Sequence, residues 1–180
     1  MTRTRKFDAE PGILLLPKKS SDNEIILLLN TGAGKDNLVG IVINQPKPEE
    51  NVDYNGLQLA AHFYGGDDYP EFAICLHRNQ KIFNVRKIKD IAVDGNFLAL
   101  KDAHRKDPQN TKFFFGILQW PPEEFASLII QGKWAMYNPN SIADIIFGPT
   151  EEMRERIKAR MGQDFHGVIR PTLALERPMN

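Results

Sequence analysis

Short apolar runs separated by turn residues dominate the first half of the chain. They cover residues 13–16, 25–29, 38–43, 72–76 and 89–93, and Gly, Pro or Asn close most of them. Runs of this length between turn residues favour buried strands over helices. The sequence therefore predicts five strands before residue 94.

Segments with helical spacing lie in the second half. Residues 122–131 begin with Pro122 and two glutamates, which suit a first helical turn, and Gly132 closes the segment. A short helix is predicted at 141–147, and a last helix runs to residue 162 with Thr150 as its cap. Residues 96–105 allow another helix, which Asp94 could cap. Residues 113–120 and 134–137 predict two further strands.

This order of elements predicts one α+β domain over residues 1–180. Its core is expected over about 11–162, followed by a loosely packed tail at 163–180. Trp120 and Trp134 end two strands that flank one helix, so we expect both to be buried in one cluster. Truncating either to Ala should cost on the order of 3 kcal/mol.

The charge balance limits the kinds of partner. Lys plus Arg number 23 and Asp plus Glu number 23, so the formal net charge is zero. Non-specific binding to nucleic acid needs a cationic face, which this balance does not provide on average. A chain without net charge has little colloidal repulsion, which favours weak self-association into a homo-oligomer.

Cysteine usage and hydropathy predict a cytoplasmic protein. Cys75 is the only cysteine, so no intramolecular disulfide can form, and this fits a reducing compartment. The basic N-terminus has no apolar core behind it and is not a secretory signal. The apolar runs are too short to cross a bilayer, so no membrane association is expected.

Gly32-Ala33-Gly34-Lys35 resembles the end of a phosphate-binding loop. That motif needs a glycine where Leu29 stands and Ser or Thr where Asp36 stands. These differences favour a turn over a nucleotide site.

Tyr64-Gly65-Gly66-Asp67-Asp68 is the most distinctive local sequence. We expect Gly65 and Gly66 to be structural, with a positive φ or a neighbour that leaves no room for a Cβ. The two carboxylates could hold a hard cation such as Mg²⁺, but neighbouring carboxylates in a turn are more often simply solvated.

Cys75 and His77 could form a nucleophile and its base, because alternate residues of a strand face the same side. Their apolar neighbours favour core packing instead. The histidines lack zinc-site spacing. We therefore predict no catalytic, cofactor or metal site.

Several short elements, taken in order, resemble the AlgH/YqgE family. They are Pro11–Pro17, Val39–Pro46, Tyr64-Gly65-Gly66, Leu76-His77, Gly116–Trp120, Trp134 and Ile146-Phe147. The resemblance covers roughly residues 11–162. It implies a bent mixed sheet closed into a pseudo-barrel, with a few helices packed around it. It implies no enzyme activity, and nothing here resembles the helix-turn-helix of a direct regulator.

The chain departs from the family pattern at polar positions. These positions hold Asp67, Asp68, Glu123, Glu124, Ala126, Leu128 and Gly132. The resemblance therefore implies a retained scaffold with changed polar positions, and it leaves the effect of those changes open.

Two functional hypotheses follow. The first is a non-catalytic protein with a role in regulation that binds a protein partner or a small ligand. Its candidate cleft holds Tyr64, Gly65, Gly66, Asp67, Asp68, His77 and Trp120. The second is an enzyme with an unrecognised site near the Gly65-Gly66 turn.

Direct, sequence-specific binding to nucleic acid is not expected. Basic residues gather at Arg3, Arg5 and Lys6, and again at Arg154, Arg156, Lys158 and Arg160. Glutamates in the last helix, such as Glu151 and Glu155, weaken the field of the second group.

Overall fold

The computed structural model describes residues 9–19, 21–30, 36–47, 52–59, 62–81, 85–94 and 96–170. The strands before the first helix are β1 (Leu14–Pro17), β2 (Ile26–Leu28), β3 (Leu38–Val42), β4 (Pro46–Lys47), β5 (Val52–Tyr54), β6 (Leu57–Leu59), β7 (His62–Tyr64), β8 (Asp68–His77), β9 (Arg86–Ile88) and β10 (Ile91–Val93). The later elements are α1 (Phe97–Lys106), a 3-10 turn (Pro108–Asn110), β11 (Thr111–Trp120), α2 (Pro122–Ile130), β12 (Trp134–Tyr137), α3 (Ala143–Phe147), α4 (Met153–Gln163) and β13 (Val168–Ile169).

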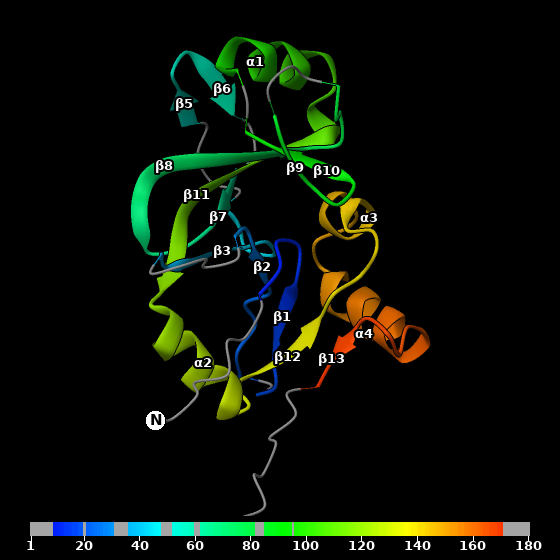
Figure 1. Ribbon diagram of the computed structural model, residues 1–180. Helices are drawn as coiled ribbons and strands as arrows, with labels where there is room; N and C mark the ends of the chain where they lie inside the picture. The colour runs from blue at the N-terminus through cyan, green and yellow to red at the C-terminus, as the bar shows by residue number, and fades with distance from the viewer. Residues whose placement is uncertain are drawn as a thin grey trace, which may run out of the picture.

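One large sheet organises the fold, in the order β13-β12-β1-β2-β3-β11-β8-β10-β9. Its pairs are antiparallel, except that β7 runs parallel to β11. The ten-residue strand β11 joins the two halves, because its end pairs with β3 and its beginning pairs with β8. The register of the β8–β11 pairing shifts around Gly116, close to where the pairing with β3 begins. Figure 1 shows β8 and β11 crossing above β1 and β2.

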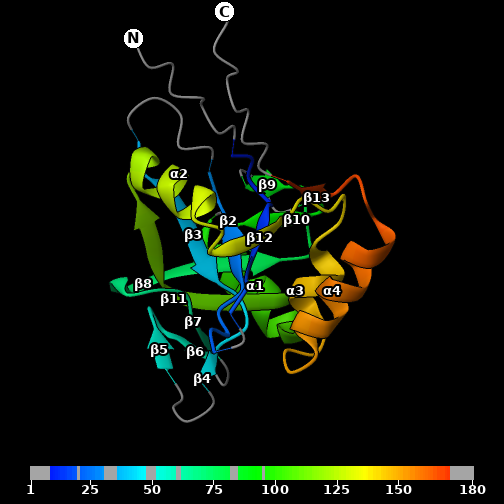
Figure 2. The ribbon, with the colours of Figure 1, turned by 90° about the horizontal axis from the view of Figure 1, so that it is seen from below.

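Alternate residues of β1, β2 and β3 pack into two cores on opposite faces of the sheet. The first, which we call the closed core, takes from these strands and their ends Leu14, Leu16, Ile25, Leu27, Leu29, Ile41 and Ile43. The second, the open layer, takes Ile13, Leu15, Ile26, Leu28, Leu38 and Val42. Two-residue periodicity thus supplies both faces from one set of apolar runs. Three helices divide between these faces: α3 and α4 pack in the closed core, while α2 packs in the open layer (Figure 2). Helix α1 packs in a third, smaller core.

The predicted α+β fold with a few helices is confirmed, and the structure shows a large, mostly antiparallel sheet. The predicted closure of that sheet into a pseudo-barrel is wrong. The sheet is open and ends at β13 and β9. Ile145 of α3 and Met153 of α4 share the closed core with Leu16 of β1 and Ile91 of β10. The two helices therefore fill the side on which the sheet would have to close (Figure 1).

Most predicted helices and strands are present, but the predicted N-terminal helix caps are wrong. Asn96, and not Asp94, caps α1, since its Oδ1 accepts the N–H groups of Leu98 at 2.9 Å and Ala99 at 3.3 Å. Asp94 instead has φ 55° and accepts the N–H of Cys75 at 3.0 Å. Thr150 does not cap α4, which begins at Met153 without a side-chain cap.

The predicted strand over 89–93 is a shorter strand preceded by a turn. Residues 89 and 90 form the turn of the β9–β10 hairpin, in which Ile91 pairs with Ile88. The positive φ of Lys89 belongs to this turn.

Part of the segment after residue 162 contacts the sheet. Strand β13 pairs with β12, and the Tyr137 hydroxyl donates to Asp164 Oδ2 at 3.0 Å. Residues 171–180 lie outside the described residues.

Candidate functional site

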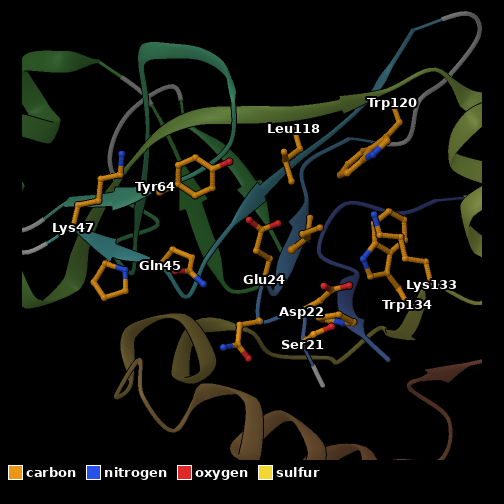
Figure 3. A pocket seen from close by; sticks show the side chains of 14 residues that line it. Ser21, Asp22, Glu24, Gln45, Lys47, Tyr64, Leu118, Trp120, Lys133 and Trp134 are labelled. Atoms are coloured by element: carbon orange, nitrogen blue, oxygen red, sulfur yellow. The ribbon is translucent and has the colours of Figure 1, made fainter. Parts of the chain in front are cut away.

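A cleft of about 740 Å³ opens on the part of the sheet that α2 leaves uncovered. Figure 3 shows its walls: the segment before β2, the β3–β4 connection, β7, the end of β11 and the start of β12. It is lined by Pro17, Ser21, Asp22, Asn23, Glu24, Ile26, Gln45, Pro46, Lys47, Tyr64, Leu118, Trp120, Lys133 and Trp134. Five separate segments of the chain therefore build one site.

The floor of the cleft is aromatic. Trp120 is 9% exposed and Trp134 is 5% exposed, and their ring centroids lie 5.7 Å apart in an edge-to-face arrangement. Phe125 of α2 stacks on Trp134, with centroids 5.9 Å apart. The predicted burial of both tryptophans in one cluster is confirmed. The tryptophans thus join the open layer to the cleft.

One end of the cleft surrounds Tyr64. Its hydroxyl donates a hydrogen bond of 2.7 Å to Asp67 Oδ1. Burial raises the pKa of Tyr64 above its ordinary value, and the hydrogen bond to Asp67 and the charge of Glu24 add to the shift. Lys47 Nζ lies 5.4 Å from the centre of the Tyr64 ring. This end therefore combines an aromatic ring with carboxylates.

The other end is basic. Lys133 Nζ lies 5.0 Å from the centre of the Trp134 ring. A smaller hollow of about 260 Å³ adjoins the cleft here, and Asp22 and Lys133 line both. Lys18 and Lys19 line the smaller hollow as well.

Side chains from outside the cleft hold its acidic wall. The Arg154 guanidinium of α4 donates to the carbonyls of Pro17 and Asp22, each at 2.9 Å. Asn44 donates from Nδ2 to the Asn23 carbonyl at 2.6 Å and accepts the N–H of Ile25 at 2.9 Å. These contacts are all to backbone, so they fix the path of the segment without neutralising its carboxylates.

Gly65 and Gly66 pack behind the cleft, against the backbone of β11. A Cβ on Gly65 would lie 2.3 Å from the Gly116 carbonyl oxygen, and one on Gly66 would lie 2.1 Å from the Ile117 oxygen. Gly116 itself has φ 81° and would meet Gly66 in the same way. The prediction that the glycines are structural is confirmed, because no Cβ fits between these strands.

The predicted site residues do not all come together. Tyr64 and Trp120 line the cleft, Asp67 binds Tyr64 from behind, and the exposed Asp68 pairs with Ile117 in the sheet. His77 lies at the far end of β8 and is 0% exposed. Its Nε2 is 3.2 Å from the Asp94 carbonyl oxygen, and it does not line the cleft.

Cys75 is not placed as a nucleophile. It packs with Leu100 and Phe113 in a third core, under α1 and the β5–β6 hairpin. Burial raises the pKa of its thiol above the ordinary value, and the charge of Asp94 adds to this. The thiolate that nucleophilic chemistry needs is therefore disfavoured.

Two further charged side chains, Asp90 and Lys112, lie beside the closed core and have shifted pKa values. Burial alone would raise the pKa of Asp90, but hydrogen bonds from Ser141, Ile142 and Ala143 outweigh it and hold the pKa below its usual range. Burial lowers the pKa of Lys112 to about 8, aided by the Arg156 charge. Lys112 Nζ donates to the Ile146 carbonyl at 2.6 Å and lies 4.7 Å from the centre of the Phe63 ring.

Metal binding, nucleotide binding and membrane crossing can each be compared with the described residues. In the part of the chain that the structure describes, no group of three or more His, Cys, Asp and Glu side chains could hold a metal ion. The Gly32–Lys35 loop lies outside the described residues. No described helix combines the length and apolar character needed to cross a membrane.

The altered family positions on α2 lie beside the cleft floor rather than in it. Glu123 and Glu124 are exposed in the first turn, Leu128 packs against the open layer and Gly132 has φ 70° after the helix. Sequence reasoning missed the acidic and basic lining residues, among them Asp22, Glu24, Lys47 and Lys133. Their local sequences carry no motif, and only the tertiary fold brings them together.

Comparison with known proteins agrees with this fold. The crystal structure of a Corynebacterium diphtheriae protein matches with a TM-score of 0.65 and 16% identity, covering 86% of this chain and 88% of that one. The solution structure of the AlgH protein from Pseudomonas aeruginosa matches with a TM-score of 0.60 and 16% identity, covering 89% and 92%. No curated protein matched. The family model described as AlgH-like matches residues 15–166, and the chain therefore belongs to the AlgH-like family, whose function is unassigned.

Proposed function

We propose that this chain is a non-catalytic binding protein whose cleft holds a small ligand or a short segment of a partner protein. The observation that carries the proposal is the cleft itself, with two buried tryptophans in its floor and charged groups of both signs at its rim. Its volume of about 740 Å³ lies in the range of small-molecule sites, roughly 300–1,000 Å³.

Binding is favoured over catalysis by where the reactive side chains lie. Cys75 is buried as a thiol in a separate core, and His77 is enclosed away from the cleft. The glycines of the Gly65-Gly66 turn face the β11 backbone, so this turn does not offer its amides to a substrate in the cleft. The alternative of an enzyme centred on that turn therefore has less support.

A regulatory role in the cytoplasm is part of the same proposal. Arg154 links the cleft wall to α4, whose Met153 and Ile157 belong to the closed core. A ligand that displaces this wall would therefore act on α4. The single buried Cys75 fits a reducing compartment, and cell fractionation would test the location.

We propose no direct regulation of DNA. Arg154 and Arg156 both donate to backbone carbonyls, and Lys158 pairs with Glu155 at 3.6 Å. Arg3, Arg5 and Lys6 lie outside the described residues. Submicromolar binding that distinguishes one duplex sequence from a scrambled one, at about 150 mM salt, would contradict this proposal.

The chain carries its own reporter for the cleft. Its only two tryptophans both line it, so intrinsic fluorescence reports on this one region. A metabolite and peptide library is screened by tryptophan fluorescence and thermal shift together. We expect at least one class of compound to change both signals, because a ligand on the indole rings alters their environment and stabilises the folded state.

A cleft-filling variant gives the control. Ser21→Tyr places a ring in the lined region, whereas Asn140→Tyr adds the same ring at an exposed position outside it. Ligand responses should disappear in the first and persist in the second. Equal binding by both variants would place the ligand elsewhere and refute the cleft as the functional site.

A further inference from the structure

The two ends of the cleft carry opposite charge. At the Tyr64 end, Glu24, Asp67 and Asp68 all lie close enough for their charges to act on the Tyr64 hydroxyl. Lys47 is the one cation among the described lining residues near that ring. At the Trp134 end, Lys133 stands with Lys18 and Lys19 around the adjoining hollow, against the single carboxylate of Asp22. Figure 3 shows Glu24 toward Tyr64 and Lys133 beside Trp134.

These charges are available to a ligand. Among the described residues, the ion pairs join Arg78 to Asp144, Lys106 to Asp102 and Lys158 to Glu155, and none involves the cleft. Arg154, which lies behind the acidic wall, donates to the carbonyls of Pro17 and Asp22 and to no carboxylate. Within the described part of the chain, charges of opposite sign thus lie at the two ends of one hollow without an ion-pair partner.

The cleft also has apolar lining. Leu118 is partly exposed and lies between Tyr64 and Trp120 in Figure 3, and the buried Ile26 lines the same cleft. A complementary ligand would bury an apolar body against these side chains, while its charged ends stay near the partly solvated rim.

Resting on the proposed function, we propose that the cleft binds a zwitterion with an apolar body, of the chemical class of short peptides with free termini. The ammonium group binds at the Glu24–Tyr64 end, where a carboxylate and an aromatic ring both favour a cation. The carboxylate binds at the Lys133 end, and a central apolar side chain contacts Ile26 and Leu118. A free amino acid shares this chemistry but has a shorter reach, so the experiment separates the two sources.

The test is calorimetric titration of the full chain with four forms of Ala-Leu-Ala: unmodified, N-acetylated, C-amidated, and modified at both ends. Free leucine is the fifth probe. The unmodified tripeptide should bind, each single cap should weaken binding about tenfold, and the double cap should abolish it. If leucine binds as tightly as the tripeptide, the ligand is a free amino acid. The proposal of a peptide is then wrong, and the proposal of a zwitterion stands.

Cleft variants fix the orientation through coupling cycles. Glu24→Gln should weaken the unmodified peptide about tenfold and have little further effect on the N-acetylated one. Lys133→Gln should do the same for the C-amidated peptide. Glu71→Gln and Lys81→Gln remove matching charges at exposed positions outside the cleft and should leave every affinity unchanged.

Three results would overturn the inference. They are no binding of the unmodified peptide up to millimolar concentration, equal affinities for capped and unmodified peptides, and coupling of Glu24 to the C-terminal carboxylate instead of the N-terminal ammonium. If library compounds still bind and Ser21→Tyr removes that binding, only the ligand class is wrong. If Ser21→Tyr leaves all binding unchanged, the proposed function itself is wrong.

Discussion

The two faces of β1, β2 and β3 are built from alternate residues of the same short runs, yet other elements cover them to different extents. On the closed core, Leu27 and Ile41 are fully buried under α3, α4 and the β9–β10 hairpin. On the open layer, α2 covers only part of the surface, and Ile26 and Trp120 continue into the cleft.

The difference teaches where stability and binding reside. A fully covered face allows each side chain to contribute its whole transfer free energy, together with its packing contacts. A partly covered face gives up some of that contribution and keeps aromatic surface accessible to a ligand. Mutations on the two faces should therefore separate unfolding from binding.

Truncation on the closed core should have the largest effect. Leu27→Ala removes a fully buried side chain, and we expect the free energy of unfolding to fall by about 4 kcal/mol. Leu118→Ala is the matched change at the cleft, where the side chain is partly exposed, and should cost less than about 1.5 kcal/mol while weakening ligand binding. Urea denaturation measures both, and equal losses would remove the distinction between the faces.

The glycine contact between the halves of the sheet comes next. Gly66→Ala should lower the free energy of unfolding by about 3 kcal/mol, because the new Cβ meets backbone atoms that cannot rotate away. Gly162→Ala provides the control, since nothing lies within 4 Å of the added atom and Ala favours helix α4. It should raise stability by about 0.5–1 kcal/mol. Thermal unfolding that moves the two variants in the same direction would contradict this account.

The elements were largely predictable from local sequence, because apolar runs and turn residues act within a few positions. Sequence reasoning overlooked the hairpin β5–β6, although Asn55-Gly56 lies at its turn with φ of 51° and 78°. That pair is a strong hairpin signal. Sequence reasoning also made β8 too short, because it began the strand at residue 72. Residues 68–71 are exposed, Tyr69 by 60%, and do not follow the pattern of a buried strand.

The cleft could be predicted only in part. Of the residues predicted for a cleft, Tyr64 and Trp120 line the one that the structure shows, and whether it binds anything stays a prediction. His77 was assigned to the same cleft because it follows the glycines by eleven residues, but it lies at the far end of the ten-residue strand β8, where it is fully buried. Lys133 and Glu24 meet through tertiary structure, which no local pattern encodes.

A smaller, pH-dependent effect should come from Lys112, the charged group beside the closed core. Burial holds its pKa at about 8 in the folded state, below its ordinary value of 10.5. Between these values the unfolded chain binds a proton that the folded chain does not, so stability rises with pH across this window. We expect Lys112 to contribute a gain of about 1 kcal/mol from pH 8 to 9.5, reduced by the partial exposure of the ammonium. The Cys75 thiol, whose pKa burial raises above its ordinary 9.0, acts in the opposite sense in this window and does so equally in a Lys112 variant.

Comparison with Lys112→Met isolates this contribution, because the variant has no titrating group at that position. The burial of Tyr64 and Tyr137 raises their pKa values, which lowers stability above about pH 10, so the window ends before that point. Guanidinium titrations at four pH values give the slope. A parent and a variant with the same slope would show that Lys112 is not desolvated in the folded protein.

The smallest change in stability should come from Arg154, which connects the two faces. It belongs to α4, whose neighbouring Met153 is fully buried in the closed core, yet its guanidinium reaches the carbonyls of Pro17 and Asp22 in the cleft wall. This arginine therefore couples α4 to the cleft wall.

Arg154→Met keeps most of the aliphatic length and loses both hydrogen bonds. The hydrogen bond to Asp22 is exposed and the one to Pro17 is part-buried, so we expect the free energy of unfolding to fall by only about 0.5–1 kcal/mol. Ligand affinity should fall several-fold, because the wall that carries Asp22 and Glu24 is no longer held and must be ordered on binding. Arg160→Met, on the same helix but outside the cleft lining, is the control and should leave affinity unchanged. Calorimetry and urea denaturation on the same samples decide the matter: an affinity loss no larger than the control's would show that the open face is organised without help from the closed one.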